Sequence, residues 1–146
     1  MLKAYRVLAA LIAAEVVVQA MAIAYGLAGL DKWVDDDHGV LTKKLLDDDS
    51  ALHFRGVGGF ALHGINGTTV IPALALLLLI LSFFATVQDG VKRAVILFVM
   101  VAVQVVLGVT LHSEPLIAPL HALNGFGILF FGYLTAKNAT PQSATE

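Results

Sequence analysis

The chain has 146 residues, enough for one domain; 58% of them are hydrophobic and 14% are charged. Because soluble domains carry about 25% charged residues, this composition predicts a protein embedded in lipid. The absence of cysteine excludes thiolate zinc sites, iron–sulfur clusters, disulfides and cysteine-attached haem. The net charge of −2, with no basic stripe, argues against nucleic acid as a partner.

Four apolar runs are long enough to cross a bilayer, which takes about 20 residues per helix. We predict spans at 4–30, 56–87, 91–111 and 116–136, with a Pro72 kink in the second. Each should be an α-helix, because lipid offers the backbone no hydrogen-bond partners. The predicted fold class is all-α, a four-transmembrane-helix bundle forming a single domain over 1–140. It has an extracytoplasmic loop at 31–55 and a disordered tail at 141–146.

The first run could pass for a signal peptide, since an Ala-x-Ala triplet stands at 20–22. The apolar run continues to Leu30, so we predict a retained first span. Lysine and arginine residues flank the spans on one side of the predicted topology: Lys3, Arg6, Lys92, Arg93 and Lys137. The positive-inside rule then places both termini in the cytoplasm of a multi-pass plasma-membrane protein.

One short motif occurs twice, as LHGING at 62–67 and LHALNG at 120–125. On a helix, residues three and four positions apart are neighbours, so each histidine has an asparagine and a glycine beside it. A histidine flanked by glycines leaves the flat gap that a porphyrin needs next to its axial ligand. The motif residues and one more glycine of the first stripe form a candidate cofactor site: His63, Asn66, Gly67, His121, Asn124, Gly125 and Gly59. The alternative is that the glycines allow close helix packing and the asparagines bridge helices.

The duplication extends to the odd-numbered spans. Gln19 in the first span aligns with Gln104 in the third, so the chain reads as two pseudo-repeated helical hairpins. A pseudo-twofold bundle would face His63 and His121 across its axis, which is the geometry of bis-histidine ligation of haem b iron. Glu15 lies one turn from Gln19, and it either serves a proton or quinone path or joins the bundle by hydrogen bonds.

Two further histidines form a second candidate pair. His112 closes the third span, with Gly108 one turn before it. His53 stands shortly before the second span, next to Arg55, which could pair with haem propionates near the outer surface. If a second haem is bound, His53 and His112 are the ligands to test.

On these motifs the chain resembles one half of haem A synthase and related four-helix membrane b-type cytochromes. It also resembles small four-span actinobacterial membrane proteins of unassigned function. The first resemblance implies a duplicated bundle with haem-binding histidines near the outer ends of alternate spans. In the segment LHFRGVGG, Phe54 separates the family's histidine and arginine, so either His53 or His63 is the matching position. The synthase reaction is not carried over, because its catalytic acid is not evident here.

The leading hypothesis is a membrane-embedded b-type haem protein with a role in electron transfer or in a respiratory complex. Its partners would be a quinone or a respiratory-chain protein, and it could form a homo-oligomer. The first alternative is a cofactor-free accessory subunit, since residues 24–33 also resemble small four-span proteins of the DoxX type. The second is a small oligomeric transporter whose path is lined by Glu15 and the two glutamines. Whether any reaction is catalysed stays open.

Overall fold

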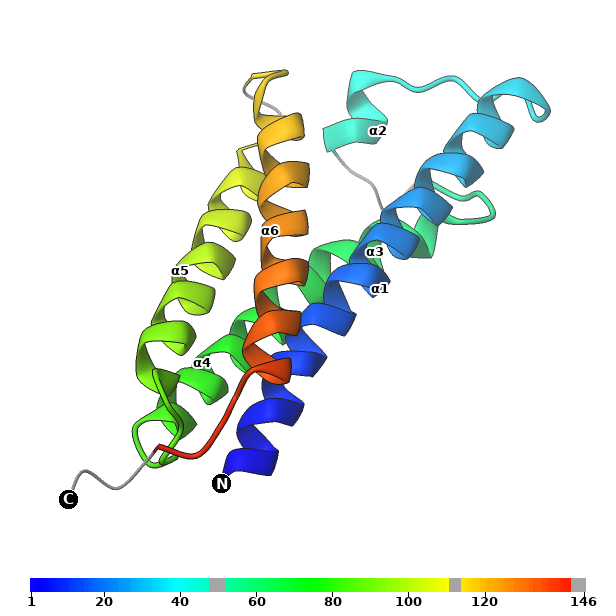
Figure 1. Ribbon diagram of the computed structural model, residues 1–146. Helices are drawn as coiled ribbons and strands as arrows, with labels where there is room; N and C mark the ends of the chain where they lie inside the picture. The colour runs from blue at the N-terminus through cyan, green and yellow to red at the C-terminus, as the bar shows by residue number, and fades with distance from the viewer. Residues whose placement is uncertain (48–51, 111–113, 143–146) are drawn as a thin grey trace. The chain divides into compact units, whose positions relative to one another are not determined.

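The computed structural model describes residues 1–47, 52–110 and 114–142. Its elements are helical: α1 (Leu2–Asp35), α2 (Lys43–Asp47), α3 (Val57–Ile65), a π-helical turn (Asn66–Val70), α4 (Ile71–Ser82), α5 (Gly90–Val109) and α6 (Ile117–Lys137) (Figure 1). These described ranges contain no strand beyond one isolated bridge between Val87 and Pro141. Four helices are long and apolar enough to cross a membrane, counting Val57–Ser82 as one. The all-α class is thus confirmed, as is the presence of four helices long and apolar enough to cross a membrane.

The helix ends differ from the predicted spans mainly on the first two. Helix α1 continues to Asp35, beyond the predicted end at residue 30, so the connecting segment starts later. The second span ends at Ser82 instead of residue 87. Here the Ser82 hydroxyl donates to the Leu79 carbonyl at 2.6 Å, and the Phe83 amide bonds to the Ile80 carbonyl in a tightened last turn.

The π-helical turn Asn66–Val70 interrupts the second span just before Pro72. Proline has no N–H, so it cannot donate to the carbonyl four residues earlier, and the ladder must adjust there. Extra-residue turns of this type occur frequently at functional sites. This turn carries Asn66 and Gly67 of the first motif, which the sequence had predicted on a regular helix.

By internal contacts the chain divides into two compact units. Unit 1 comprises Met1–Val17 and Gly67–Glu146, and unit 2 comprises Val18–Asn66. Helix α1 contributes its first half to unit 1 and its second half to unit 2.

Each helical segment of unit 1 contributes at least one large, fully buried apolar or aromatic side chain to the core. They include Tyr5 of α1, Leu78 of α4, Leu97 of α5 and Ile128 of α6. Helix α5 lies against both α4 and α6 (Figure 1). The Tyr5 hydroxyl donates to the Gly90 carbonyl at 2.8 Å, so the single polar atom of this core side chain is satisfied.

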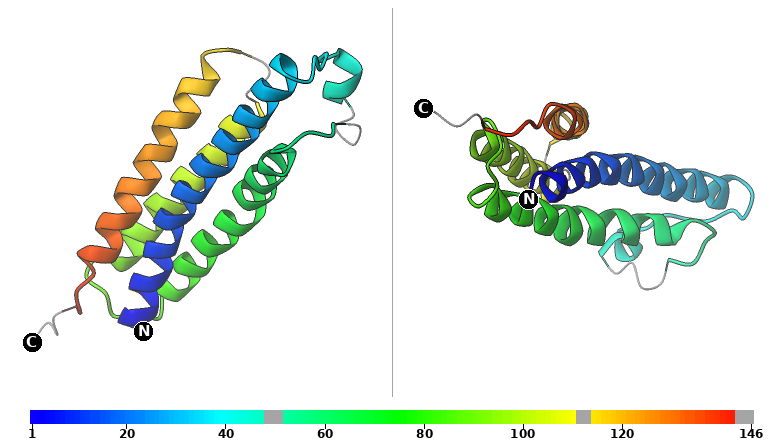
Figure 2. Two further views of the ribbon diagram at one scale, coloured as in Figure 1. Left: turned by 90° about the vertical axis from the view of Figure 1, so that its right-hand side faces the viewer. Right: turned by 60° about the horizontal axis from the view of Figure 1, so that its bottom comes forward.

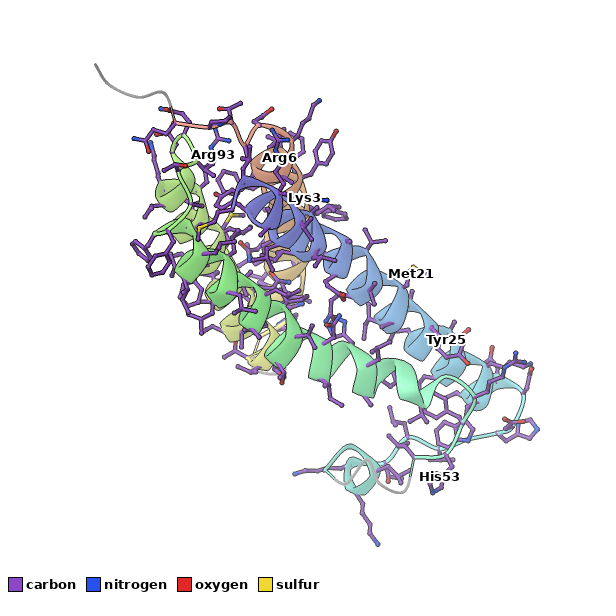
Figure 3. The ribbon with its side chains drawn as sticks, turned by 90° about the horizontal axis from the view of Figure 1, so that it is seen from below. Lys3, Arg6, Met21, Tyr25, His53 and Arg93 are labelled. Carbon is purple, nitrogen blue, oxygen red and sulfur yellow. The ribbon has the colours of Figure 1, made fainter. Side chains whose placement is uncertain are left out.

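One end of unit 1 is basic and is closed by the segment that follows α6. Arg6 donates through Nε to the Ala139 carbonyl at 3.1 Å, and Arg93 donates to the Asn138 carbonyl at 3.2 Å. Lys3, Arg6 and Arg93 lie together at this end (Figure 3). The N-terminus and the end of α6 lie there as well (Figure 2).

The predicted tail at 141–146 begins with hydrogen-bonded residues. The Gln142 amide bonds to the Thr86 carbonyl at 3.0 Å, and the Gln88 amide bonds to the Thr140 carbonyl at 2.9 Å. The last four residues lie outside the described part of the chain.

In unit 2, glycines bring α1 and α3 into backbone contact. A Cβ on Gly59 would lie 2.4 Å from the Ala22 carbonyl oxygen, and one on Gly29 would lie 2.0 Å from the Arg55 carbonyl oxygen. Both spaces are too small for a methyl group, so these glycines set how closely the two segments approach. The stack of Trp33 on Phe54, with centroids 5.9 Å apart, packs the segment before α3.

We expect Gly59→Ala to destabilise the protein by about 1–3 kcal/mol, because the new methyl must displace the α1 backbone. Gly58→Ala is the matched control, since a Cβ there meets nothing within 4 Å. The control should be neutral or stabilising by up to about 1 kcal/mol, because alanine favours helix more than glycine does. Thermal unfolding in detergent, followed by circular dichroism, measures both. Equal melting temperatures for the two variants would contradict the packing role.

Candidate histidine sites

His63 lies in α3 of unit 2, half-buried, with its Nδ1 atom 3.1 Å from the backbone carbonyl oxygen of Gln19. A carbonyl oxygen only accepts hydrogen bonds, so Nδ1 must carry the proton. In the neutral ring the lone pair is then on Nε2. Metal-binding histidines are commonly held in this way, with one nitrogen donating to a carbonyl while the other faces the metal.

The side chain of Gln19 carries a second signal. Its amide oxygen and nitrogen are both buried, and neither has a hydrogen-bond partner among the described residues. Leaving such groups unpaired costs about 1–3 kcal/mol each, and a native protein usually satisfies them with water, an ion or a ligand. The residue that orients His63 therefore also presents polar atoms suited to a bound group.

His121 lies in α6 of unit 1 and belongs to a chain of side-chain hydrogen bonds. Asn124 donates through Nδ2 to the Met100 carbonyl at 2.9 Å and to the Gln104 Oε1 atom at 2.8 Å. The Gln104 Nε2 atom lies 3.1 Å from His121 Nε2. Because Oε1 accepts from Asn124, the Gln104 amide nitrogen is the donor to the histidine.

These hydrogen bonds determine which nitrogen of the His121 ring carries the proton. With Nε2 accepting from Gln104, the proton of the neutral ring is on Nδ1. Gln104 thereby relays the contact of Asn124 to the imidazole. The two histidines thus differ, since His63 donates through Nδ1 to a backbone carbonyl and His121 accepts through Nε2 from an amide.

The predicted glycine gaps are used in two ways. Gly59 does not border an open gap, because it faces the α1 backbone as described above. Gly108, expected beside His112, instead faces the other histidine: a Cβ there would lie 3.1 Å from His121 Cε1. Gly125 faces the amide of Gln104, with a Cβ distance of 3.3 Å to Nε2. In unit 1, therefore, glycines do lie beside the imidazole and its partner.

The remaining candidates are dispersed. Asn66 is buried and Gly67 half-buried in the π-helical turn. His53 and Arg55 are exposed in the segment before α3. His112 lies outside the described residues, so the second predicted ligand pair cannot be assembled here.

Sequence reasoning identified Gln104 as a polar mid-span residue but did not join it to His121. No spacing rule connects two residues on different helices, so only the pairing of α5 with α6 reveals this contact. Asn124 also donates to the backbone carbonyl of Met100, and such a backbone acceptor cannot be identified from the residue type. The described residues contain no cluster of three or more histidine, cysteine or acidic side chains that could hold a metal ion.

Comparison with models of protein families, with curated proteins and with solved structures found no match to this chain. The Gln19 contact of His63 uses Nδ1 and does not occupy the Nε2 lone pair. At His121 the Gln104 hydrogen bond does occupy the Nε2 lone pair, and histidine binds iron through such a lone pair.

We expect Gln104→Leu and Asn124→Leu each to destabilise the protein by about 1–3 kcal/mol, because each removes a side chain whose hydrogen-bond partners are then left unsatisfied. The double variant should cost less than the sum, with a coupling of about 0.5–3 kcal/mol. Gln88→Leu is the control, because this glutamine is exposed; it should change stability by less than about 0.5 kcal/mol. Unfolding in detergent measures all four, and strictly additive losses at positions 104 and 124 would count against the relay.

Proposed function

We propose that this protein is a membrane-embedded b-type haem protein that carries electrons, with His63 and His121 as its axial ligands. The observation that carries the proposal is that each histidine of the repeated motif is held by the glutamine of the preceding span: His63 by the Gln19 carbonyl and His121 by the Gln104 amide. An imidazole that donates its Nδ1 proton to a carbonyl, as His63 does, is typical of metal-ligand sites. Bound haem would supply a reversible one-electron change at its iron.

The repeat strengthens the proposal. The hairpins α1–α3 and α5–α6 place a glutamine on the first helix and a histidine on the second. In each hairpin the two are in hydrogen-bond contact. We infer that the hairpins arose by duplication, with the segment between α1 and α3 inserted in the first copy. Their contacts have since diverged, one using the glutamine backbone and the other its side chain.

The chain's own residues would orient the ligands and exclude water. The Gln19 carbonyl holds the Nδ1 proton of His63 and so keeps the lone pair on Nε2. Gln104 would play a different part, since it must leave the His121 lone pair before iron can bind there. The apolar helices around both rings would keep the local dielectric low, which is one of the means by which proteins adjust haem potentials.

Topology and partners complete the proposal. The basic end of unit 1, with Lys3, Arg6 and Arg93, would face the cytoplasm of a plasma-membrane protein by the positive-inside rule. The redox partner would be a quinone or a respiratory-chain protein, and the protein could work as a homo-oligomer.

A cofactor-free accessory subunit is the second candidate. It is favoured by the hydrogen bonds that link Asn124, Gln104 and His121, in which the histidine Nε2 atom is satisfied without any cofactor. In that function the histidine would join α5 to α6, and Gln104 would be required for stability only.

The absorption spectrum of the purified protein separates the two. We expect a Soret band with sharp reduced alpha and beta bands after expression with sufficient haem. His63→Ala and His121→Ala should each abolish the low-spin spectrum by removing one ligand nitrogen. Protein of native helicity that stays colourless after incubation with haem would contradict the proposal.

Two further variants sharpen the test. His38→Asn removes an exposed histidine whose backbone φ of 55° suits asparagine, and it should leave the spectrum unchanged. Gln104→Ala releases the His121 lone pair, so it should maintain or raise haem occupancy while lowering apoprotein stability. If low-spin haem persists in both His63→Ala and His121→Ala, the ligands are elsewhere and His53 with His112 is the next pair.

A further inference from the structure

An apolar groove runs along unit 1 between the first half of α1 and the second half of α6. Its larger part has a volume of about 560 Å³, within the range of small-molecule sites. Alanines of α1 form one wall and aromatic rings of α6 form the other: Ala10, Ala13, Ala14, Val17, Phe126, Leu129, Phe130 and Tyr133. The groove exists because the α1 side chains are small while the α6 rings stand out, with Phe126 69% exposed and Phe130 65% exposed.

The groove continues into a basic end. A second hollow of about 370 Å³ shares Ala10 and Tyr133 with the first and is also lined by Arg6 and Lys137. The Lys137 ammonium lies 5.7 Å from the centre of the Tyr133 ring, which fixes it at the edge of the groove. Ala139 accepts from two of the Arg6 nitrogens, and a guanidinium has five N–H donors, so this side chain can bind a further acceptor.

We propose that this groove is a binding site for one anionic phospholipid, with its phosphate between Arg6 and Lys137 and an acyl chain along α1. The inference is independent of haem binding. From Arg6 to Val17 the helix rises about 16 Å. Half of a hydrocarbon core about 30 Å thick is nearly the same length. The groove therefore has the dimensions of a single leaflet, with cations where a headgroup lies.

Charge decides against a second copy of this chain as the occupant. Copies inserted by the same positive-inside rule share one orientation, so a second α1 in the groove would bring its own Arg6 to this basic end. Like charges would then meet at the same end of the groove and repel each other. A phosphate diester instead complements both cations, and clusters of lysine and arginine at the end of a span are typical of anionic-lipid recognition.

Native mass spectrometry of the delipidated protein tests the site, with phosphatidylglycerol and phosphatidylcholine of equal chain length as probes. We expect wild type to bind phosphatidylglycerol several-fold more tightly. Lys137→Gln should remove most of that preference and leave weak binding of both lipids. Lys92→Gln is the matched control, because it removes a cation on α5 that does not line the groove.

Filling the groove with a larger side chain tests the site independently of its charge. Ala14→Leu should weaken binding of both lipids, whereas Ala102→Leu, on an exposed position of α5, should not. Circular dichroism verifies that each variant is folded. The proposal is overturned if wild type binds the two lipids equally or if Lys137→Gln and Lys92→Gln behave alike. A second copy of the protein would be the occupant if Ala14→Leu changed only the oligomeric mass, and that result would overturn the proposal. The proposal is also overturned if Ala14→Leu abolishes binding of a neutral isoprenoid quinone but leaves phosphatidylglycerol binding unchanged.

Discussion

The hydrocarbon interior of a membrane offers no hydrogen-bond partner, so a buried polar group in a span is costly unless the protein or a bound group satisfies it. That constraint produces helices in all four predicted spans, and it explains why the hydroxyl of core residue Tyr5 reaches the Gly90 carbonyl. It also explains why Gln104, Asn124 and His121 join one another between α5 and α6. Where proline removes a donor, at Pro72, the helix adopts a π-helical turn.

The same constraint sets stability against the proposed haem ligation at His121. The hydrogen bond from Gln104 joins two helices, yet it also occupies the ring nitrogen that a haem iron would need. At His63 the Gln19 carbonyl accepts from Nδ1 instead, so that contact uses the opposite ring nitrogen. A protein that binds haem would therefore exchange one helix–helix contact for a bond to iron, and loss of haem would restore the contact. The buried, unpartnered amide of Gln19 is consistent with a bound group in unit 2.

Glycine placement shows how far a pattern can be taken. The sequence indicated that glycines lie beside histidines, which holds for Gly108 and His121, although the sequence had paired Gly108 with His112. Gly59 carries the same signal, but it faces the α1 backbone and allows close approach. A stripe of small residues gives the same sequence pattern whether it faces another helix or an imidazole ring, because the pattern defines only one face of a helix. What lies opposite that face depends on the neighbouring element.

The sequence by itself determined the helical class, the four candidate spans and the collection of Lys3, Arg6 and Arg93 at one end. Each follows from local physics, because helix hydrogen bonds join residues four apart and hydrophobic length is read along one segment. Only the tertiary structure decided that Gln104 relays Asn124 to His121 and that small and aromatic side chains form a groove between α1 and α6. These features arise where separate helices cross, and side-chain packing sets that crossing without any fixed spacing in the sequence.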